Sequence, residues 1–109
     1  MDKESYSGEM SKMLTVPRDR VVQVSSEILG KKLRAGPHGR SKQFGLITEV
    51  GDEVIVPFPK QHTNDRDINV HLAQDILRKV IIRKMQDSGQ QVFDEELFRK
   101  AKKMLRDTN

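Results

Sequence analysis

The sequence predicts an α+β fold in which a small antiparallel β-hairpin, at about residues 42–58, has one helix before it and two helices after it. Residues 44–50 and 53–58 are short runs rich in β-branched, aromatic and other apolar side chains. Gly51 and Asp52 separate the two runs, and this pair is typical of a hairpin turn. Because the second run is apolar on both faces, we expect it to be central or covered on both sides.

The segment before the hairpin, residues 14–33, predicts a helix. Pro17 stands where a helix can begin, since a proline at the first helical position loses no intrahelical hydrogen bond. Apolar or small side chains then recur at helical spacing: Val21, Val24, Ser25, Ile28 and Leu29. The alternative is a short strand over 20–24 followed by a helix over 27–33.

Two helices are predicted after the hairpin. The first is capped by Asp67 or Asn69. Its wide apolar stripe consists of Leu72, Ala73, Ile76, Leu77, Val80, Ile81 and Met85. The second begins at Asp94, an N-cap residue, and Phe93 can pack onto Phe98 across that cap. Cations cover the outer side of this last helix: Lys100, Lys102, Lys103 and Arg106.

Length and composition limit the classes of protein. The 109 residues suit one α+β domain over 14–109, preceded by a flexible arm over 1–13. Cysteine is absent, which excludes disulfides, thiol nucleophiles and Cys-based zinc sites. No apolar run approaches the roughly 20 residues of a membrane span, and the N-terminus lacks the apolar centre of a signal peptide. We therefore expect a cytoplasmic protein with no membrane partner and no cofactor.

Positive charge is concentrated just before the hairpin. No acid occurs between Glu27 and Glu49. Gly36 and Pro37 break any helix there and predict a basic, glycine-rich loop. Lys and Arg on such a loop can bind phosphates, and glycine lets backbone N–H groups approach them. The predicted nucleic-acid-binding residues are Lys31, Lys32, Arg34, His38, Arg40 and Lys42. The sequence thus favours a small nucleic-acid-binding or regulatory protein, with DNA or RNA as its partner.

Contact with phosphates is favoured over base stacking, because Phe44 is the aromatic residue beside this loop. The simpler interpretation is a solvated helix end, in which Lys31, Lys32 and Arg34 offset the helix dipole. That interpretation does not account for the cations that follow Pro37.

The histidines allow two further chemical hypotheses. Two of them, with nearby acids, could be drawn as a metal site: His62, Asp65, Asp67 and His71. Their spacing matches no known ligand pattern, so no metal is predicted. His38 could act as a general base in RNA cleavage, with Arg40 and Lys42 holding a phosphate. Nothing selects this role over that of a surface histidine, so an enzyme is the less favoured interpretation.

The two C-terminal helices carry more apolar surface than a two-stranded hairpin can cover. Their stripes could pack on the first helix, or they could remain exposed. The second class of function is therefore a protein-interaction module or inhibitor that docks through its C-terminal helices. The same stripes favour a homodimer.

Two segments resemble parts of known families. Residues 36–39 (GPHG) and 45–56 (GLITEVGDEVIV) together resemble the KOW element of SH3-like barrels, which occur in ribosomal and transcription-elongation proteins. The gap between Gly39 and Gly45 is wider than in that element. This resemblance implies nucleic-acid binding.

The order of helix, glycine-rich basic strand, strand ending at 56–57 (VP), loop and helix containing 76–78 (ILR) is similar to HicA-type toxins. These are small RNA-cleaving proteins with a double-stranded-RNA-binding-like fold, so the resemblance implies a ribonuclease as a third function. In that family the catalytic histidine follows Gly-Ser at the start of the first strand. The corresponding residues here, 39–42 (GRSK), contain no histidine.

Overall fold

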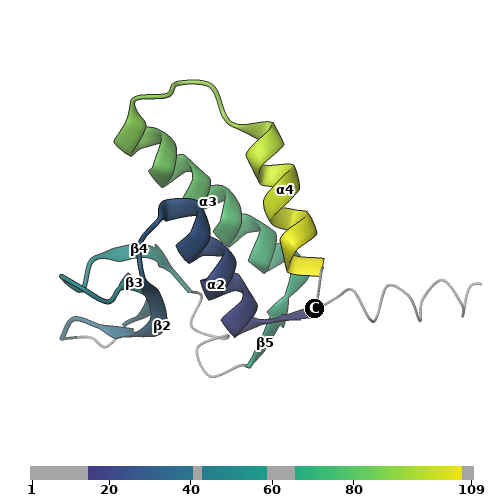
Figure 1. Cartoon of the computed structure of the whole chain (residues 1–109). Helices are drawn as coiled ribbons and strands as arrows, with labels where there is room; N and C mark the ends of the chain where they lie inside the picture. The colour runs from purple at the N-terminus through teal and green to yellow at the C-terminus, as the bar shows by residue number, and fades with distance from the viewer. Residues whose placement is uncertain (1–14, 41–42, 59–65, 107–109) are drawn as a thin grey trace, which may run out of the picture.

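The computed structural model describes residues 15–40, 43–58 and 66–106, which form an α+β fold (Figure 1). In chain order the elements are β1 (Thr15–Pro17), α2 (Arg18–Leu29), β2 (Leu33–His38), β3 (Gln43–Thr48), β4 (Val54–Pro57), β5 (Asp67–Asn69), α3 (Val70–Ser88) and α4 (Glu95–Arg106). The predicted fold class is confirmed, with one helix before the hairpin and two after it. The arm expected at 1–13 lies outside the described residues.

Helix α2 begins directly after Pro17, as predicted. Gly30 ends the helix with a φ of 65°, a left-handed conformation that glycine adopts without steric cost. The Gly30 N–H donates to the Ser26 carbonyl at 2.8 Å. The alternative of a strand over 20–24 is wrong, because these residues lie within α2 and bury Val21 and Val24 on one helical face.

Residues 33–38 form strand β2, where the sequence predicted the end of a helix and a loop. The strand pairs antiparallel with β3 over its whole length, from Leu33 opposite Thr48 to His38 opposite Gln43. The sheet therefore has three strands in the order β2-β3-β4, and the predicted hairpin is its β3–β4 half. A Gly-Pro pair is more typical of a loop, which is why the local pattern did not indicate this strand.

Pro37 is compatible with β2 because of its place in the pairing. Phe44 lies opposite it, and the Phe44 carbonyl accepts from the Phe58 N–H at 3.0 Å, on the β4 side. Pro37 and Phe44 therefore form a non-hydrogen-bonded pair. The missing N–H of Pro37 falls on the outer edge of the sheet, where no ladder bond is lost.

Strand β4 lies at an edge of the sheet, and the central strand is β3. Of the two alternatives expected for the second strand, the central position is therefore wrong. A β-bulge between β3 and β4 breaks the simple alternation, so Val56 is buried while Val54 and Ile55 are half-buried. Both edge strands carry a proline, Pro37 or Pro57, and proline at an edge opposes pairing with another chain.

The short strands β1 and β5 were not predicted, and they join two distant parts of the chain. Val16 pairs with Ile68, and both side chains are buried. The Arg18 N–H donates to the Arg66 carbonyl at 2.7 Å, so the first turn of α2 is fixed to the start of β5. Each strand has only three residues, too few for a recognisable alternation.

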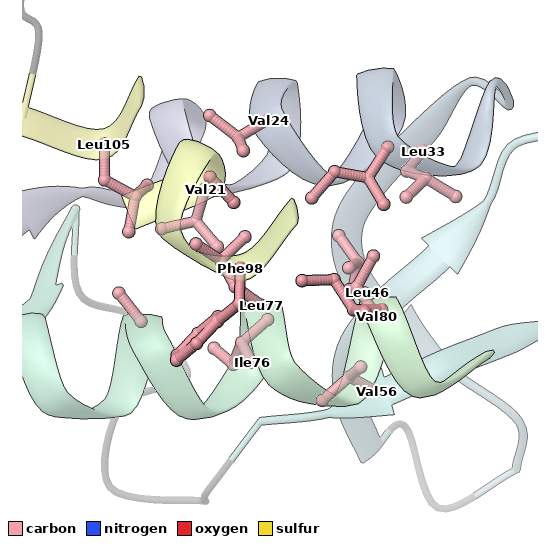
Figure 2. Close-up of a cluster of buried hydrophobic side chains, with 14 of the residues drawn as sticks. Val21, Val24, Leu33, Leu46, Val56, Ile76, Leu77, Val80, Phe98 and Leu105 are labelled. Carbon is pink, nitrogen blue, oxygen red and sulfur yellow. The ribbon is translucent and has the colours of Figure 1, made fainter. Parts of the chain in front are cut away.

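The elements pack in three layers. Figure 1 shows the β2–β3–β4 sheet on one side, α2 and α3 in the middle, and α4 on the other side. Figure 2 shows Leu33, Leu46 and Val56 where the sheet meets the middle layer, and Phe98 and Leu105 where α4 meets it. All five side chains are buried. The middle layer therefore has an apolar contact on each of its faces, which explains its many buried side chains.

The caps of both C-terminal helices match the prediction. The Asn69 side chain accepts from the His71 N–H at 2.8 Å and begins α3. The Asp94 side chain accepts from the Leu97 N–H at 3.0 Å and begins α4. The Phe93 ring meets the edge of the Phe98 ring, with centroids 5.8 Å apart, which confirms the predicted contact across the cap.

Candidate nucleic-acid interface

The predicted phosphate-binding residues lie along one extended edge strand rather than in one loop. Lys31 and Lys32 precede β2, Arg34 and His38 lie within it, and Arg40 follows it in the turn. Lys42 lies outside the described residues. From Lys32 to His38 the chain extends by about 20 Å, at about 3.3 Å per residue. No single phosphate can therefore reach both ends of the set.

Acids from the β3–β4 turn pair with two of these cations. We call residues 49–53 the acidic turn. Arg34 Nη2 lies 2.8 Å from Asp52 Oδ1, and Lys32 Nζ lies 4.0 Å from Glu49 Oε2. The Lys32 side chain is 83% exposed, so its pairing is weak. The Arg34 side chain is only 40% exposed and makes a direct hydrogen bond. Arg34 is therefore the more strongly engaged of the two.

Arg34 lies across its own strand. A Cβ at position 36 would lie 2.6 Å from Arg34 Nη1, so Gly36 provides the space that the guanidinium occupies. Arg34 and Gly36 are two residues apart and share the face of the sheet that points away from α2 and α3. This arrangement aims Arg34 at Asp52 rather than at solvent, and the acidic turn thereby becomes part of that face.

The third acid of the turn is tied to α3. Glu53 pairs with Arg83, whose Nε also lies 3.4 Å from Asp87 Oδ1. The hydrogen bond to Glu53 raises the pKa of Arg83 above its ordinary value. Within the turn, the Glu53 N–H donates to Thr48 Oγ1 at 2.9 Å. All three acids of the turn are thus engaged, two with cations of the segment around β2 and one with a cation of α3.

At the other end of β2, the described residues form no such pairs with acids. His38 is half-buried and Arg40 is exposed. Within the described ranges, no ion pair joins Arg40 to an acid. His38 and Arg40 therefore remain candidates for an anion at the β2–β3 turn. The ribonuclease hypothesis requires both of them, together with Lys42, which lies outside the described residues.

Phe44 is already in contact with other side chains. Its ring stacks on the Phe58 ring with centroids 5.6 Å apart, and the Arg18 guanidinium lies 5.0 Å from its centroid. A base would have to displace one of these neighbours to stack on Phe44. This supports the preference for phosphate contact over base stacking.

The metal hypothesis finds no support in the described part of the chain. Over residues 15–40, 43–58 and 66–106, no three His, Cys, Asp or Glu side chains are close enough to hold an ion. The His71 backbone N–H is used in the α3 cap. Two members of the drawn set, His62 and Asp65, lie outside the described residues.

The apolar stripes of the C-terminal helices are buried within the chain's own core. Ile76, Leu77 and Val80 of α3 and Ala101 of α4 are each at most 1% exposed. Helix α2 and the short strands β1 and β5 provide the cover that a two-stranded hairpin lacks. Large exposed apolar side chains in the described residues are scattered over a turn, a helix and a connection: Val50, Ile82 and Val92. The stripes of the described residues are thus used in the chain's own core, while docking of a partner through these helices and a homodimer stay predictions.

Sequence reasoning gave no functional role to the cations of α4. This helix carries basic side chains along much of its length: Arg99, Lys100, Lys102, Lys103 and Arg106. The sequence places four of them, Lys100, Lys102, Lys103 and Arg106, on the outer side of an amphipathic helix. Their spacing in the sequence is enough to indicate a cationic helix face. Whether they pair with acids depends on the tertiary structure.

Comparisons with known proteins found no matching family model, no matching curated protein and no matching solved structure. In the described residues, no helix is both long enough and apolar enough to cross a membrane.

Proposed function

We propose that this protein is a small nucleic-acid-binding or regulatory protein that contacts phosphates through the basic segment around β2. The proposal rests on one observation: no acid interrupts the chain between Glu27 and Glu49, and this stretch includes an edge strand of the sheet. An edge strand is open along one side, so cations before, within and after it can approach a phosphate backbone. The contacting residues are Lys31, Lys32, Arg34, His38, Arg40 and Lys42.

The ion pairs indicate which of these residues are most available to bind a phosphate. Lys31 and Arg40 are exposed, and no ion pair joins either to an acid in the part of the chain that the structure describes. Lys32 is held only at 4.0 Å by Glu49. Arg34 would have to leave Asp52 to bind a phosphate. We therefore assign most of the binding free energy to Lys31, Lys32 and Arg40.

The length of the segment around β2 indicates how long a nucleic acid could contact it along its whole length. Phosphates along one strand of B-DNA are spaced by about 3.4 Å of helix axis, so the roughly 20 Å from Lys32 to His38 covers about six base pairs. Contacts at both ends of β2 therefore favour a polymer over a mononucleotide.

The test is binding of labelled double-stranded and single-stranded nucleic acids at about 50 and 200 mM salt. The variant K31Q/K32Q/R40Q removes three positive charges, and it is expected to lower the slope of log K against log salt by about 2 to 3 units. The matched control K31R/K32R/R40K keeps the charges and should keep the slope.

No binding by the unaltered protein at low salt would refute the proposal. Equal slopes for the unaltered protein and the glutamine variant would exclude this segment as the site. Cleavage of RNA that His38→Ala abolishes, while binding persists, would indicate the ribonuclease instead.

A further inference from the structure

Helix α4 presents a second cationic surface, which we call the α4 face and define as Arg99, Lys100, Lys103 and Arg106. All four side chains are exposed. With 3.6 residues per turn they fall within a sector of about 120°. The opposite side of the helix is anchored by Phe98, Ala101 and Leu105, which are buried. The α4 face is therefore a fixed surface and not a loose tail.

The cations of the α4 face make no ion pair with an acid in the part of the chain that the structure describes. This holds although Glu95 and Glu96 lie in the first turn of the same helix. The helix dipole accounts for cations in the last turn, which here are Lys103 and Arg106. It does not account for Arg99 and Lys100, which precede the last turn. Helix stability alone therefore does not explain why these four cations gather on one face of α4.

Neighbouring helices extend this surface. The Arg78 guanidinium from α3 and Lys102 Nζ each lie 4.7 Å from the centroid of the Phe98 ring. Arg20 of α2 donates from Nη1 to the Met104 carbonyl at 3.4 Å. Two neighbouring helices thus place positive charge beside α4, in addition to its own Lys102.

The α4 face is distinct from the segment around β2. Helices α2 and α3 separate α4 from the β2–β3–β4 sheet, as Figure 1 shows. A ligand lying along β2 cannot also lie along α4 without passing around the middle layer.

We infer that the α4 face is a second binding site, for the phosphate backbone of duplex DNA. Cations repeat along about 10 Å of helix from Arg99 to Arg106, and a phosphate backbone presents anions at similarly short intervals. Base stacking is not available, because the aromatic residue of this helix, Phe98, is buried. Duplex is therefore favoured over single strands.

DNA is favoured over RNA by the shape of the surface. An exposed helix is convex and about 10–12 Å across, and the major groove of B-DNA, about 12 Å wide, admits one. The major groove of A-form RNA is too deep and narrow to do so. If the segment around β2 also binds, one molecule joins two duplexes. That consequence rests on the proposed function, whereas the α4 site does not.

The test compares two glutamine variants by fluorescence anisotropy with a labelled DNA duplex. K31Q/K32Q/R40Q should retain binding through α4. Four phosphate contacts predict a salt slope of about 3.6 for this residual binding, which is roughly a 150-fold loss of affinity between 50 and 200 mM salt. Adding R99Q/K100Q/K103Q/R106Q should abolish it. The matched variant E95Q/E96Q removes acids from the same helix and should tighten binding.

The outcomes separate the two sites. If R99Q/K100Q/K103Q/R106Q alone binds DNA with unchanged affinity and slope, the α4 site is excluded and the proposed function is unaffected. If K31Q/K32Q/R40Q binds like the unaltered protein and the α4 variant does not bind, the proposed function fails and the α4 site stands. Residual α4 binding that prefers duplex RNA, or that polyglutamate displaces as well as DNA does, would overturn the assignment to DNA.

Discussion

Surface cations are paired with carboxylates at the acidic turn, whereas those of the α4 face make no ion pair in the described residues. At the acidic turn, Arg34 and Arg83 meet carboxylates from Asp52 and Glu53. Along the α4 face no such pairing occurs in the described residues. A count of Lys and Arg would treat the two regions alike. The comparison shows that the available charge, rather than the number of basic residues, indicates where an anion can bind.

The difference has a structural cause. The acidic turn has little apolar material of its own, since Val50 at its tip is 90% exposed. Its position therefore depends on polar contacts with β2 and α3. Helix α4 is held by buried Phe98, Ala101 and Leu105. Ion pairs of its cations are therefore not needed to fix its position. The cations that the fold does not need remain free for a ligand.

The largest expected effect tests whether burial holds α4. Phe98→Ala removes a buried ring from between α2, α3 and α4, and it should lower the free energy of unfolding by about 3–5 kcal/mol. Urea denaturation measures this change. Leu46→Ala at the sheet is the matched core control, with an expected loss of about 2–5 kcal/mol. A loss below about 1 kcal/mol for Phe98→Ala would contradict the packing of α4 described above.

The second effect is expected when the acids of the acidic turn are neutralised, so that the cations near it are unpaired like those of the α4 face. Glu49→Gln with Asp52→Asn releases Lys32 and Arg34 from their carboxylates. The salt slope of nucleic-acid binding should rise by up to about 2 units, one for each cation released. Asn suits position 52, where φ is 50°. Asp75→Asn, which frees Lys79 from a 3.1 Å pair on α3, is the control and should leave the slope unchanged. An unaltered slope in the double variant would show that these acids do not mask the segment around β2.

The third effect concerns the start of α4. Asp94→Ala removes the acceptor for the Leu97 N–H and should cost about 1 kcal/mol of stability. Asp94→Asn keeps an acceptor and should cost less. Thermal unfolding of the two variants decides between them. Equal losses in both would mean that the charge of Asp94 at the helix start contributes more than its hydrogen bond.

The smallest effect is expected at the tip of the acidic turn. Val50→Thr changes an exposed side chain and should alter the free energy of unfolding by less than about 0.5 kcal/mol. Nucleic-acid binding should also be unchanged. A large loss of stability would reveal a contact that the tip makes in solution, and it would weaken the view that only polar contacts hold this turn.

Local patterns predicted most of the helices and the hairpin correctly. Pro17, Asn69 and Asp94 marked helix starts because capping depends on a few neighbouring residues. Gly51 and Asp52 marked the β3–β4 turn for a similar reason. Strand β2 was not predicted because its Gly36-Pro37 pair is tolerated only at an edge, and sequence does not show which strand is at an edge.

The candidate site was predicted in part. The sequence located the cations around β2 and the absence of acids among them. It did not show that Asp52, in the following hairpin, reaches back to Arg34, because that contact depends on the register of β2 against β3. Nor did it show that α4 stands across the middle layer from the sheet.

The sequence by itself determined the α+β class, the helix caps, the hairpin turn and the positions of the basic residues, because each depends on short-range geometry or on composition. The tertiary structure alone decided the order of the strands, the pairing of cations with the acidic turn, and the separation of the segment around β2 from the α4 face. These features depend on which distant segments meet, and the burial of apolar side chains from every element at once selects those meetings.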